Sequence, residues 1–419
     1  MSGTIAEKIL ARVTGKKEVN AGDFIDANVD LAMSHDNALL VLKIFKEIDR
    51  KKVWNPQKIA IVLDHRSPAN SIKTADNQNL IREFVRNQKI RNFYDVGEGI
   101  CHQVLPEHGL VHPGMLIVGT DSHTTTYGAF GAFATGIGAT DMASVWSTGK
   151  LWLKVPETLG FNIQGNLLLP VMSKDIILSI IGRIGSDGAN YKSCEFFGEI
   201  VENMSIDSRM CISNQAMEMG AKTAIIQPDE KTFNYLKFTT NKPYKIVESD
   251  KDAEYEKIFD FNVEDIEPQV SCPDKVDNVK PISQVIGVNI DQAVLGSCTN
   301  GRLEDLAIAS SILRDKRISK NVRMIVIPAS RLVYLEAIKK GYIEIFLKSG
   351  ATIINPGCGP CLGLHEGVVG KGETVISSTN RNFKGRMGSP QAEIYLASPA
   401  TVAISAIKGE ISDPREKIR

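Results

Sequence analysis

Five short apolar runs, each followed directly by a polar or glycine-containing loop, constrain the fold of this chain more than any other feature. The runs are rich in Val, Ile and Leu and too short for helices, which is typical of strands buried in a parallel sheet. Helical patterns follow the loops, so the sequence predicts an α/β architecture with largely parallel sheets. Because functional groups gather at the carboxyl ends of such strands, we expect the loops to converge on one crevice. The runs with their loops are KIAIVLDH (58–65), MLIVGTDSH (115–123), QAVLGSCTNG (292–301), VRMIVIPAS (322–330) and ATIINPGCG (351–359).

The length of the chain and two proline-marked interruptions predict its division into domains. A chain of 419 residues accommodates roughly two to four domains of ordinary size. A helical pattern ends near Pro156, and the α/β alternation restarts near Pro281 after a stretch rich in acidic residues and proline. We therefore expect three α/β domains, at 1–157, 158–283 and 284–419.

Charge and cysteine usage narrow the class of protein. Lys plus Arg and Asp plus Glu both number 49, and this balance predicts neither a nucleic-acid partner nor attraction to an anionic membrane. Seven scattered cysteines, an odd number, fit a reducing compartment better than a disulfide scaffold. The N-terminal segment MSGTIAEKILARVTGKKEV has the pattern of a short amphipathic helix and lacks the apolar core of a signal peptide. We expect a cytoplasmic protein without a membrane-spanning segment.

Three cysteines form a candidate metal site. Cys358 and Cys361 make a C-x-x-C motif in NPGCGPCLG, and Cys298 lies upstream in GSCTNG. Each motif follows an apolar run and contains glycine, which lets the backbone approach a ligand closely. The other four cysteines are expected to be packing residues, because a free thiol behaves as a small hydrophobic group. They are Cys101, Cys194, Cys211 and Cys272.

Three interpretations compete for these thiols. A structural zinc site would need a fourth ligand, and the chain has no second C-x-x-C. The tetrapeptide Cys358-Gly359-Pro360-Cys361 is the one that thioredoxins use, but a redox pair leaves Cys298 without a role. An iron–sulfur cluster with four cysteine ligands transfers electrons, whereas three ligands leave one iron open as a Lewis acid. The incomplete set of cysteines therefore favours catalysis.

Four motifs in a fixed order resemble the aconitase superfamily: GTDSHTTTYGAFGAFATGIGATD, GSCTNGRLEDL, NPGCGPCLG and STNRNFKGR. The resemblance implies three α/β domains with mostly parallel sheets around a central cleft. It implies one [4Fe-4S] cluster per subunit, held by Cys298, Cys358 and Cys361. The implied activity is that of a hydro-lyase, which isomerises a hydroxy-di- or tricarboxylate by eliminating water and adding it back the other way round.

Acid–base groups are expected at the strand ends. Asp64-His65 and Asp121-Ser122-His123 place a carboxylate beside an imidazole. A carboxylate bonded to histidine orients the ring and raises its pKa, which suits the histidine to protonate a departing hydroxyl. By resemblance, His102 in GICHQV is a further active-site histidine.

Other residues are expected to bind the substrate. Arg381 and Arg386 in NRNFKGR are guanidinium groups that can bind carboxylates bidentately, and the resemblance assigns them to the carboxylates of the substrate. Asn380 is expected to orient this loop at the substrate. The resemblance also matches His35 in AMSHDN to a substrate-contacting position, and Glu195 in CEFFGE to a catalytic glutamate near the water-binding iron.

The resemblance also implies a partner. In single-chain members of the superfamily a C-terminal swivelling domain carries the catalytic serine that removes the substrate proton. This chain ends shortly after NRNFKGR, so the resemblance implies that a small subunit supplies this domain, in a heterodimer or heterotetramer. The expected reaction converts 2-isopropylmalate to 3-isopropylmalate in leucine biosynthesis; homoaconitase and 2,3-dimethylmalate dehydratase are the alternatives. RNA binding, known for some relatives, is disfavoured by the zero net charge.

Overall fold

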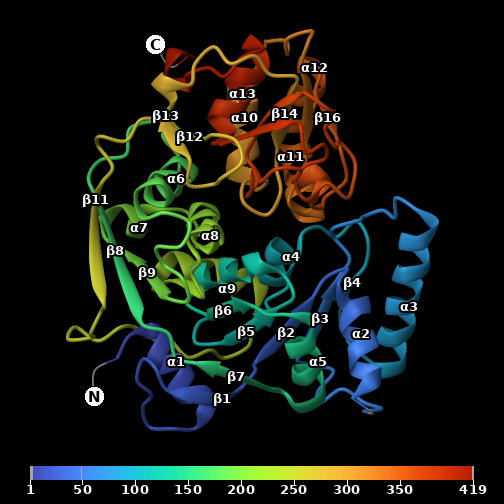
Figure 1. The fold of residues 1–419 in the computed structure, drawn as a ribbon, viewed down its shortest axis with the longest axis vertical. Helices are drawn as coiled ribbons and strands as arrows, with labels where there is room; N and C mark the ends of the chain where they lie inside the picture. The colour runs from blue at the N-terminus through green and yellow to red at the C-terminus, as the bar shows by residue number, and fades with distance from the viewer. Residues whose placement is uncertain (1–2, 49, 418–419) are drawn as a thin grey trace.

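The computed structural model describes residues 3–48 and 50–417, and within them three sheets carry the fold. Helices cover the sheets, and the N-terminus lies at the opposite end of the long axis from the C-terminus (Figure 1). Most strand pairs in the three sheets are parallel, which confirms the predicted α/β class. No helix in the described part of the chain is long and apolar enough to cross a membrane.

The first sheet has five parallel strands in the order β4-β3-β2-β5-β6. The strands are β2 (Leu31–Ser34), β3 (Ile59–Val62), β4 (Asn92–Tyr94), β5 (Leu116–Gly119) and β6 (Phe133–Gly136). The helices beside them are α1 (Ile5–Thr14), α2 (Ala38–Glu47), α3 (Ile72–Gln88), α4 (Cys101–Glu107), the 3-10 helix η1 (Ser122–Phe130) and α5 (Ala139–Thr148). A separate antiparallel pair joins β1 (Phe24–Asn28) to β7 (Lys150–Lys154).

The second sheet has four parallel strands in the order β10-β9-β8-β11. They are β8 (Thr158–Gln164), β9 (Ser193–Phe197), β10 (Thr223–Ile226) and β11 (Lys257–Asn262). The associated helices are α6 (Ser173–Ile184), α7 (Glu199–Asn203), α8 (Ile206–Gln215), η2 (Ala216–Met219) and α9 (Glu230–Thr239).

The third sheet has seven strands in the order β13-β12-β18-β17-β14-β15-β16. The strands are β12 (Gln269–Ser271), β13 (Val279–Pro281), β14 (Gln292–Leu295), β15 (Arg323–Val326), β16 (Thr352–Ile353), β17 (Thr374–Ser377) and β18 (Glu393–Ala397). The helices are η3 (Ile282–Gln284), α10 (Leu303–Leu313), α11 (Arg331–Lys339), α12 (Tyr342–Ser349), η4 (Gly359–Leu362), α13 (Pro399–Lys408) and η5 (Pro414–Lys417). Because β12 and β13 pair into this sheet, its strands begin before the expected boundary at residue 283.

Local sequence explains where helices begin and end. Thr4 caps α1: its hydroxyl accepts the Glu7 N–H, and the Glu7 carboxylate accepts the Thr4 N–H. The apolar face of α1 is buried, so the expected amphipathic helix is confirmed. Helix α5 ends at Gly149, where φ is 73°, and this turn lets the chain reverse into β7.

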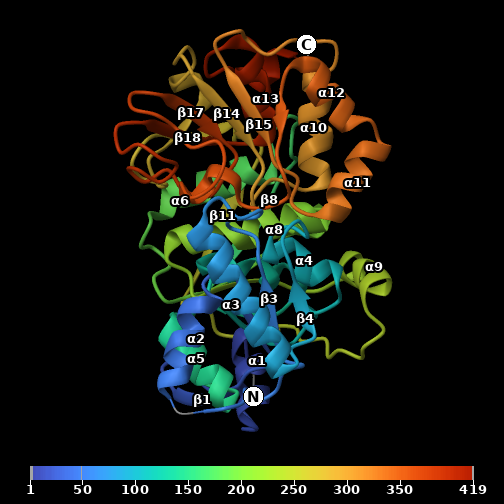
Figure 2. The ribbon, with the colours of Figure 1, turned by 90° about the vertical axis from the view of Figure 1, so that its right-hand side faces the viewer.

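The carboxyl ends of two sheets meet at one place. The first sheet lies at the N-terminal end of the long axis and the third at the other end, with α8 between them (Figure 2). The loop after β16 reaches the loop after β3, where the Cys358 N–H donates to the Asp64 carbonyl at 3.1 Å. This backbone hydrogen bond joins two of the loops that the sequence expects to converge.

Candidate active site

Asp121 is the centre of a cluster of imidazoles beyond the first sheet. The residue follows β5, and its Oδ1 accepts hydrogen bonds from the His123 backbone N–H at 2.7 Å and from His102 Nε2 at 3.1 Å. Its Oδ2 lies 3.4 Å from His65 Nε2 and 3.9 Å from His35 Nε2. Burial raises the pKa of Asp121, but the hydrogen bonds from His102, His123 and His65 together hold it well below its ordinary value. Asp121 is therefore a carboxylate that orients several proton-carrying rings.

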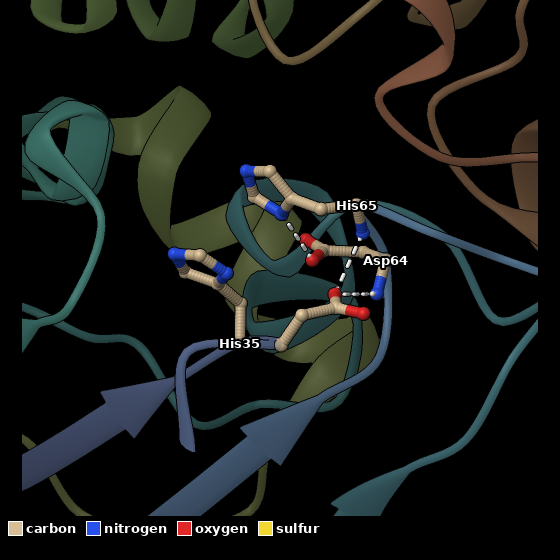
Figure 3. Close-up of side chains that lie close together, drawn as sticks. His35, Asp64 and His65 are labelled. Atoms are coloured by element: carbon tan, nitrogen blue, oxygen red, sulfur yellow. Dashed lines mark hydrogen bonds and ion pairs between the residues drawn. The ribbon is translucent and has the colours of Figure 1, made fainter. Parts of the chain in front are cut away.

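His65 lies between two carboxylates. Its Nδ1 donates to Asp64 Oδ1 at 2.6 Å, and the second Asp64 oxygen accepts the Cys101 N–H at 2.8 Å. Burial lowers the pKa of His65, but the charges of Cys358 and Asp64 and the hydrogen bond to Asp121 raise it well above its ordinary value. The His35 ring stacks on the His65 ring with centroids 4.0 Å apart, and Figure 3 shows the His35 ring below the His65 ring and to one side of the Asp64 carboxylate. Burial and the His65 charge lower the pKa of His35. The stack therefore pairs one readily charged imidazole with one that stays neutral.

A second carboxylate, Glu218, links the cluster to Arg381. Its Oε1 accepts hydrogen bonds from His123 Nε2 at 2.8 Å and from Arg381 Nε at 2.7 Å. Burial raises the pKa of Glu218, but the hydrogen bond and charge of His123 and the charge of Arg381 lower it overall. The sequence interpretation missed Glu218 because no motif surrounds it. The signal that could have found it is the i, i+4 spacing of Asn214 and Glu218 in a buried helical stretch.

Glu195, the glutamate expected at the active site, lies elsewhere. It is on β9, and its carboxylate accepts hydrogen bonds from the Ile5 N–H at 2.8 Å, Ser249 Oγ at 2.6 Å and the Tyr255 hydroxyl at 2.8 Å. These contacts fasten α1 to the second sheet. The structure does not bring Glu195 to the acid–base cluster, and the carboxylate found there is that of Glu218.

The three cysteines of the expected metal site lie close to this cluster. None of the seven cysteines, all within the described residues, forms a disulfide. Cys298 and Cys361 both lie against the Asn380 side chain, with their Sγ atoms 3.6 and 3.5 Å from its Oδ1. Burial raises the pKa of Cys358, and the nearby His65 counteracts part of that rise. Burial raises the pKa of Cys298 to about 12, so a bound cation is needed to make it a thiolate at neutral pH.

Two asparagines surround the Cys298 sulfur. The Nδ2 groups of Asn214 and Asn380 each donate to Cys298 Sγ at 3.3 Å, and Asn380 Nδ2 also donates to Asn214 Oδ1 at 2.6 Å. Asn380 was expected at the substrate, but the structure places it against the thiols, with 1% of its surface exposed. Three free buried thiols with amide N–H donors at one sulfur fit a thiolate-ligated iron–sulfur cluster.

A cavity of about 520 Å³ opens beside the cluster. Arg381 and Arg386 form its cationic wall, and Arg386 Nε, although buried, has no hydrogen-bond partner among the described residues. A carboxylate in the cavity would satisfy that donor. Of the other expected site residues, the ones that line the cavity are His35, His65, Asp121 and His123.

A further group of metal-ligand types lies in the same region. One oxygen or nitrogen from each of His35, Asp36, Asp64 and His65 lies within 4.8 Å of the others. Three of their four carboxylate oxygens already accept hydrogen bonds, because Asp36 Oδ2 accepts the N–H groups of Asp64 and His65, and the two Asp64 oxygens accept those of His65 and Cys101. We therefore interpret this group as part of the acid–base cluster.

Comparison with known proteins gives the family. The model of the aconitase family (aconitate hydratase) matches residues 7–289 and 283–409. The chain is 56% identical to the probable 3-isopropylmalate dehydratase large subunit of Methanothermobacter thermautotrophicus, covering 99% of both chains. It is 52% identical to the probable methanogen homoaconitase large subunit of the same organism, over 99% of this chain and 98% of the other.

A solved structure supports the fold. The crystal structure of Thermococcus kodakaraensis aconitase X, in its holo-form, superposes with a TM-score of 0.51 at 14% identity and covers 89% of this chain and 88% of that one. At this identity the likeness concerns the fold alone, and it agrees with the mostly parallel α/β architecture described above. The family match and the full-length relatives together show that this chain belongs to the aconitase family.

Proposed function

We propose that this chain is the cluster-bearing large subunit of a hydro-lyase that converts 2-isopropylmalate to 3-isopropylmalate. One observation carries the proposal: a cavity lined by two arginines and a carboxylate–imidazole cluster lies close to three free, buried thiols, of which Cys298 and Cys361 contact Asn380, the residue before Arg381. Full-length relatives named 3-isopropylmalate dehydratase large subunit support it.

The residues around the cavity have two different roles, binding of the substrate carboxylates and transfer of protons. Arg381 and Arg386 bind the carboxylates of the substrate. Glu218 holds the Arg381 guanidinium in its orientation by accepting a hydrogen bond from the Arg381 Nε. Hydroxide is a poor leaving group, so the elimination needs a proton at the departing oxygen. Asp121 orients His65 and His102 as proton carriers, Glu218 orients the His123 ring, and Asp64 holds His65 from the other side. When water adds back, the same rings take up the proton that the water molecule releases as its oxygen bonds to carbon.

We infer that Cys298, Cys358 and Cys361 hold a [4Fe-4S] cluster, one per chain. When bound, such a cluster offers an open iron as a Lewis acid for the hydroxyl and a carboxylate of the substrate. Asn214 and Asn380 stabilise the Cys298 thiolate through their N–H groups. Anaerobic reconstitution of the chain and of Cys358→Ser, followed by iron and sulfide determination, tests the ligand set; unchanged cluster content in the variant would overturn it.

The base that removes the proton from carbon is proposed to be a serine on a small subunit. Relatives of this chain are named large subunits, which supports a small partner. We expect the cluster-loaded chain to show no turnover by itself and to gain activity when the small subunit is added. Full turnover without a partner would refute this part of the proposal.

The choice of substrate is tested by kinetics of the reconstituted complex. We expect the highest kcat/KM for 2-isopropylmalate, compared with homoaconitate and 2,3-dimethylmalate under the same conditions. A higher value for homoaconitate would replace the main proposal by the homoaconitase alternative, which the relative named homoaconitase large subunit supports. No turnover of any hydroxy acid by the cluster-loaded complex would refute both.

A further inference from the structure

Lys222 is a third cation on the wall of the cavity. It directly precedes β10 and lines the same cavity as Arg381 and Arg386. Its Nζ lies over the Tyr191 ring, 5.3 Å from the ring centroid, and Tyr191 also lines the cavity. This cation–π contact holds the ammonium at the wall. The second sheet therefore contributes a cation to a cavity whose two arginines follow β17 of the third sheet.

The three cations of the wall differ in their partners. Arg381 is paired with Glu218, so its charge is already compensated in part. In the described part of the chain neither Arg386 nor Lys222 forms an ion pair, and the buried Nε of Arg386 has no hydrogen-bond partner. Two of the three cations are therefore free to bind an anion that enters the cavity.

The protein compensates the charge of Lys222 only weakly. Burial lowers the pKa of Lys222, and the charge of the Asp141 carboxylate counteracts this. Asp141 is exposed and lies in the first turn of α5, where water and the helix dipole already stabilise it. A partly buried ammonium with so little compensation gains from a carboxylate beside it.

Lys222 belongs to the open side of the cavity. The Tyr191 ring beneath its ammonium is 36% exposed, and Gly138, close to the Asp141 carboxylate, is exposed as well. Both residues line the cavity, whose other side is formed by the buried ring of His65. A substrate that reaches the acid–base cluster from solvent therefore enters a cavity that has Lys222 at its exposed side.

We propose that Lys222 binds a carboxylate of the substrate at the open side of the cavity. The inference rests on the proposed function, because it requires a dicarboxylate substrate. Such a substrate brings two carboxylates, and the two cations without an ion pair, Arg386 and Lys222, match that number. The lysine ammonium has three N–H donors on a flexible stem, so it can bind a carboxylate in more than one orientation.

Three variants test this contact in the reconstituted complex with its small subunit. Lys222→Met keeps the apolar stem and removes the charge, whereas Lys222→Arg keeps the charge. Lys192→Met is the matched control, because it removes one positive charge close by: the Lys222 N–H donates to the Lys192 carbonyl. The Lys192 side chain is paired with Glu157 and Glu256 and is not among the described residues that line the cavity.

We expect Lys222→Met to raise KM for 2-isopropylmalate roughly tenfold, the equivalent of one charge-assisted hydrogen bond, with kcat changed less than about twofold. Lys222→Arg should stay within about threefold of the wild-type KM, and Lys192→Met should keep the wild-type value. The wild-type KM should rise with ionic strength more steeply than that of Lys222→Met, because salt screens the attraction that the variant lacks. Calorimetric titration of each complex with 2-isopropylmalate should give the same ratios for Kd.

The contrary outcomes separate this inference from the proposed function. Turnover by the wild type with unchanged KM and Kd in Lys222→Met would overturn the inference alone. An equal loss in Lys222→Arg, or a matching loss in Lys192→Met, would also overturn it, because the effect would then come from local packing or from overall charge. If the wild type bound 2-isopropylmalate without converting any hydroxy acid, the proposed function would fail and the Kd ratios would still decide the role of Lys222. If it neither bound nor converted one, both would fail.

Discussion

Replacement of Glu218 by glutamine tests the chemistry of the cavity most directly. The Glu218 Oε1 atom accepts from both His123 and Arg381, and the residue is 6% exposed. The glutamine side chain has nearly the same shape and keeps one acceptor oxygen, but it loses the negative charge and carries an NH₂ group in place of the second oxygen. The variant therefore measures what the charge contributes to holding Arg381 and His123 in place.

The expected magnitude follows from the two hydrogen bonds. A hydrogen bond to a charged group contributes about 2 kcal/mol, and one between neutral groups about 1 kcal/mol. In the variant Arg381 is still a charged donor but has lost its buried counter-charge, and the His123 bond is weakened; together these changes should cost about 2 kcal/mol, or about a 30-fold fall in kcat/KM if the cost is felt in the transition state. The pKa of Glu218 lies below its ordinary 4.5, so its contribution is fully present above that pH and fades only as the pH falls through the lowered value. The ratio of kcat/KM between the wild type and Glu218→Gln should therefore be constant across neutral pH.

The assay is steady-state kinetics of the complex with its small subunit, and the matched control is Glu195→Gln. Glu195 is equally buried, at 3% exposure, but contacts Ile5, Ser249 and Tyr255. The control should unfold at a lower temperature and keep a wild-type kcat/KM. A large loss of kcat/KM in Glu195→Gln, with none in Glu218→Gln, would refute the assignment of the active-site glutamate.

Three further changes probe other parts of the molecule. Arg386→Lys should raise KM about tenfold, the equivalent of one lost charge-assisted hydrogen bond to a carboxylate; an unchanged KM would remove Arg386 from the substrate site. Asn380→Ala should reduce the iron retained per chain roughly tenfold in anaerobic gel filtration, because the Cys298 sulfur loses an N–H donor, and equal retention would contradict this. Gly149→Ala should lower the free energy of unfolding by about 2 kcal/mol in denaturant titration, because φ is 73° and the new Cβ would lie 2.4 Å from Trp54 Nε1. An unaltered titration midpoint would show that the α5–β7 turn tolerates a side chain.

The fold was largely predictable from the sequence because strand burial leaves a local pattern. All five apolar runs contain a parallel strand. The strands β3, β5, β14 and β15 are buried almost throughout, as in a sheet covered on both faces, whereas β16 is a two-residue edge strand that is only partly buried. The pairing of β12 and β13 with the third sheet was not predictable in this way. It depends on the long-range contact of β12 with β18, which no local period encodes.

The candidate site was predictable only where a motif marked it. The Asp64-His65 pair, Asp121 and the three cysteines lie in loops with distinctive local sequence, and the structure brings them together. Glu218 and Glu195 are both buried glutamates without such a motif, and their difference lies in partners far along the chain. Local sequence does not show which distant residues a buried glutamate will contact. The catalytic role was therefore assigned to Glu195 instead of Glu218.

The backbone amide of Cys358 can be used to detect separation of the loop after β3 from the loop after β16. The Cys358 N–H donates a hydrogen bond to the Asp64 carbonyl, and this hydrogen bond exists only while the loops after β3 and β16 are in contact. Exchange of this amide with deuterated solvent therefore requires those two loops to separate. The rate of deuterium uptake at this one backbone position then measures how often the two loops separate, with no need for substrate or partner to be present.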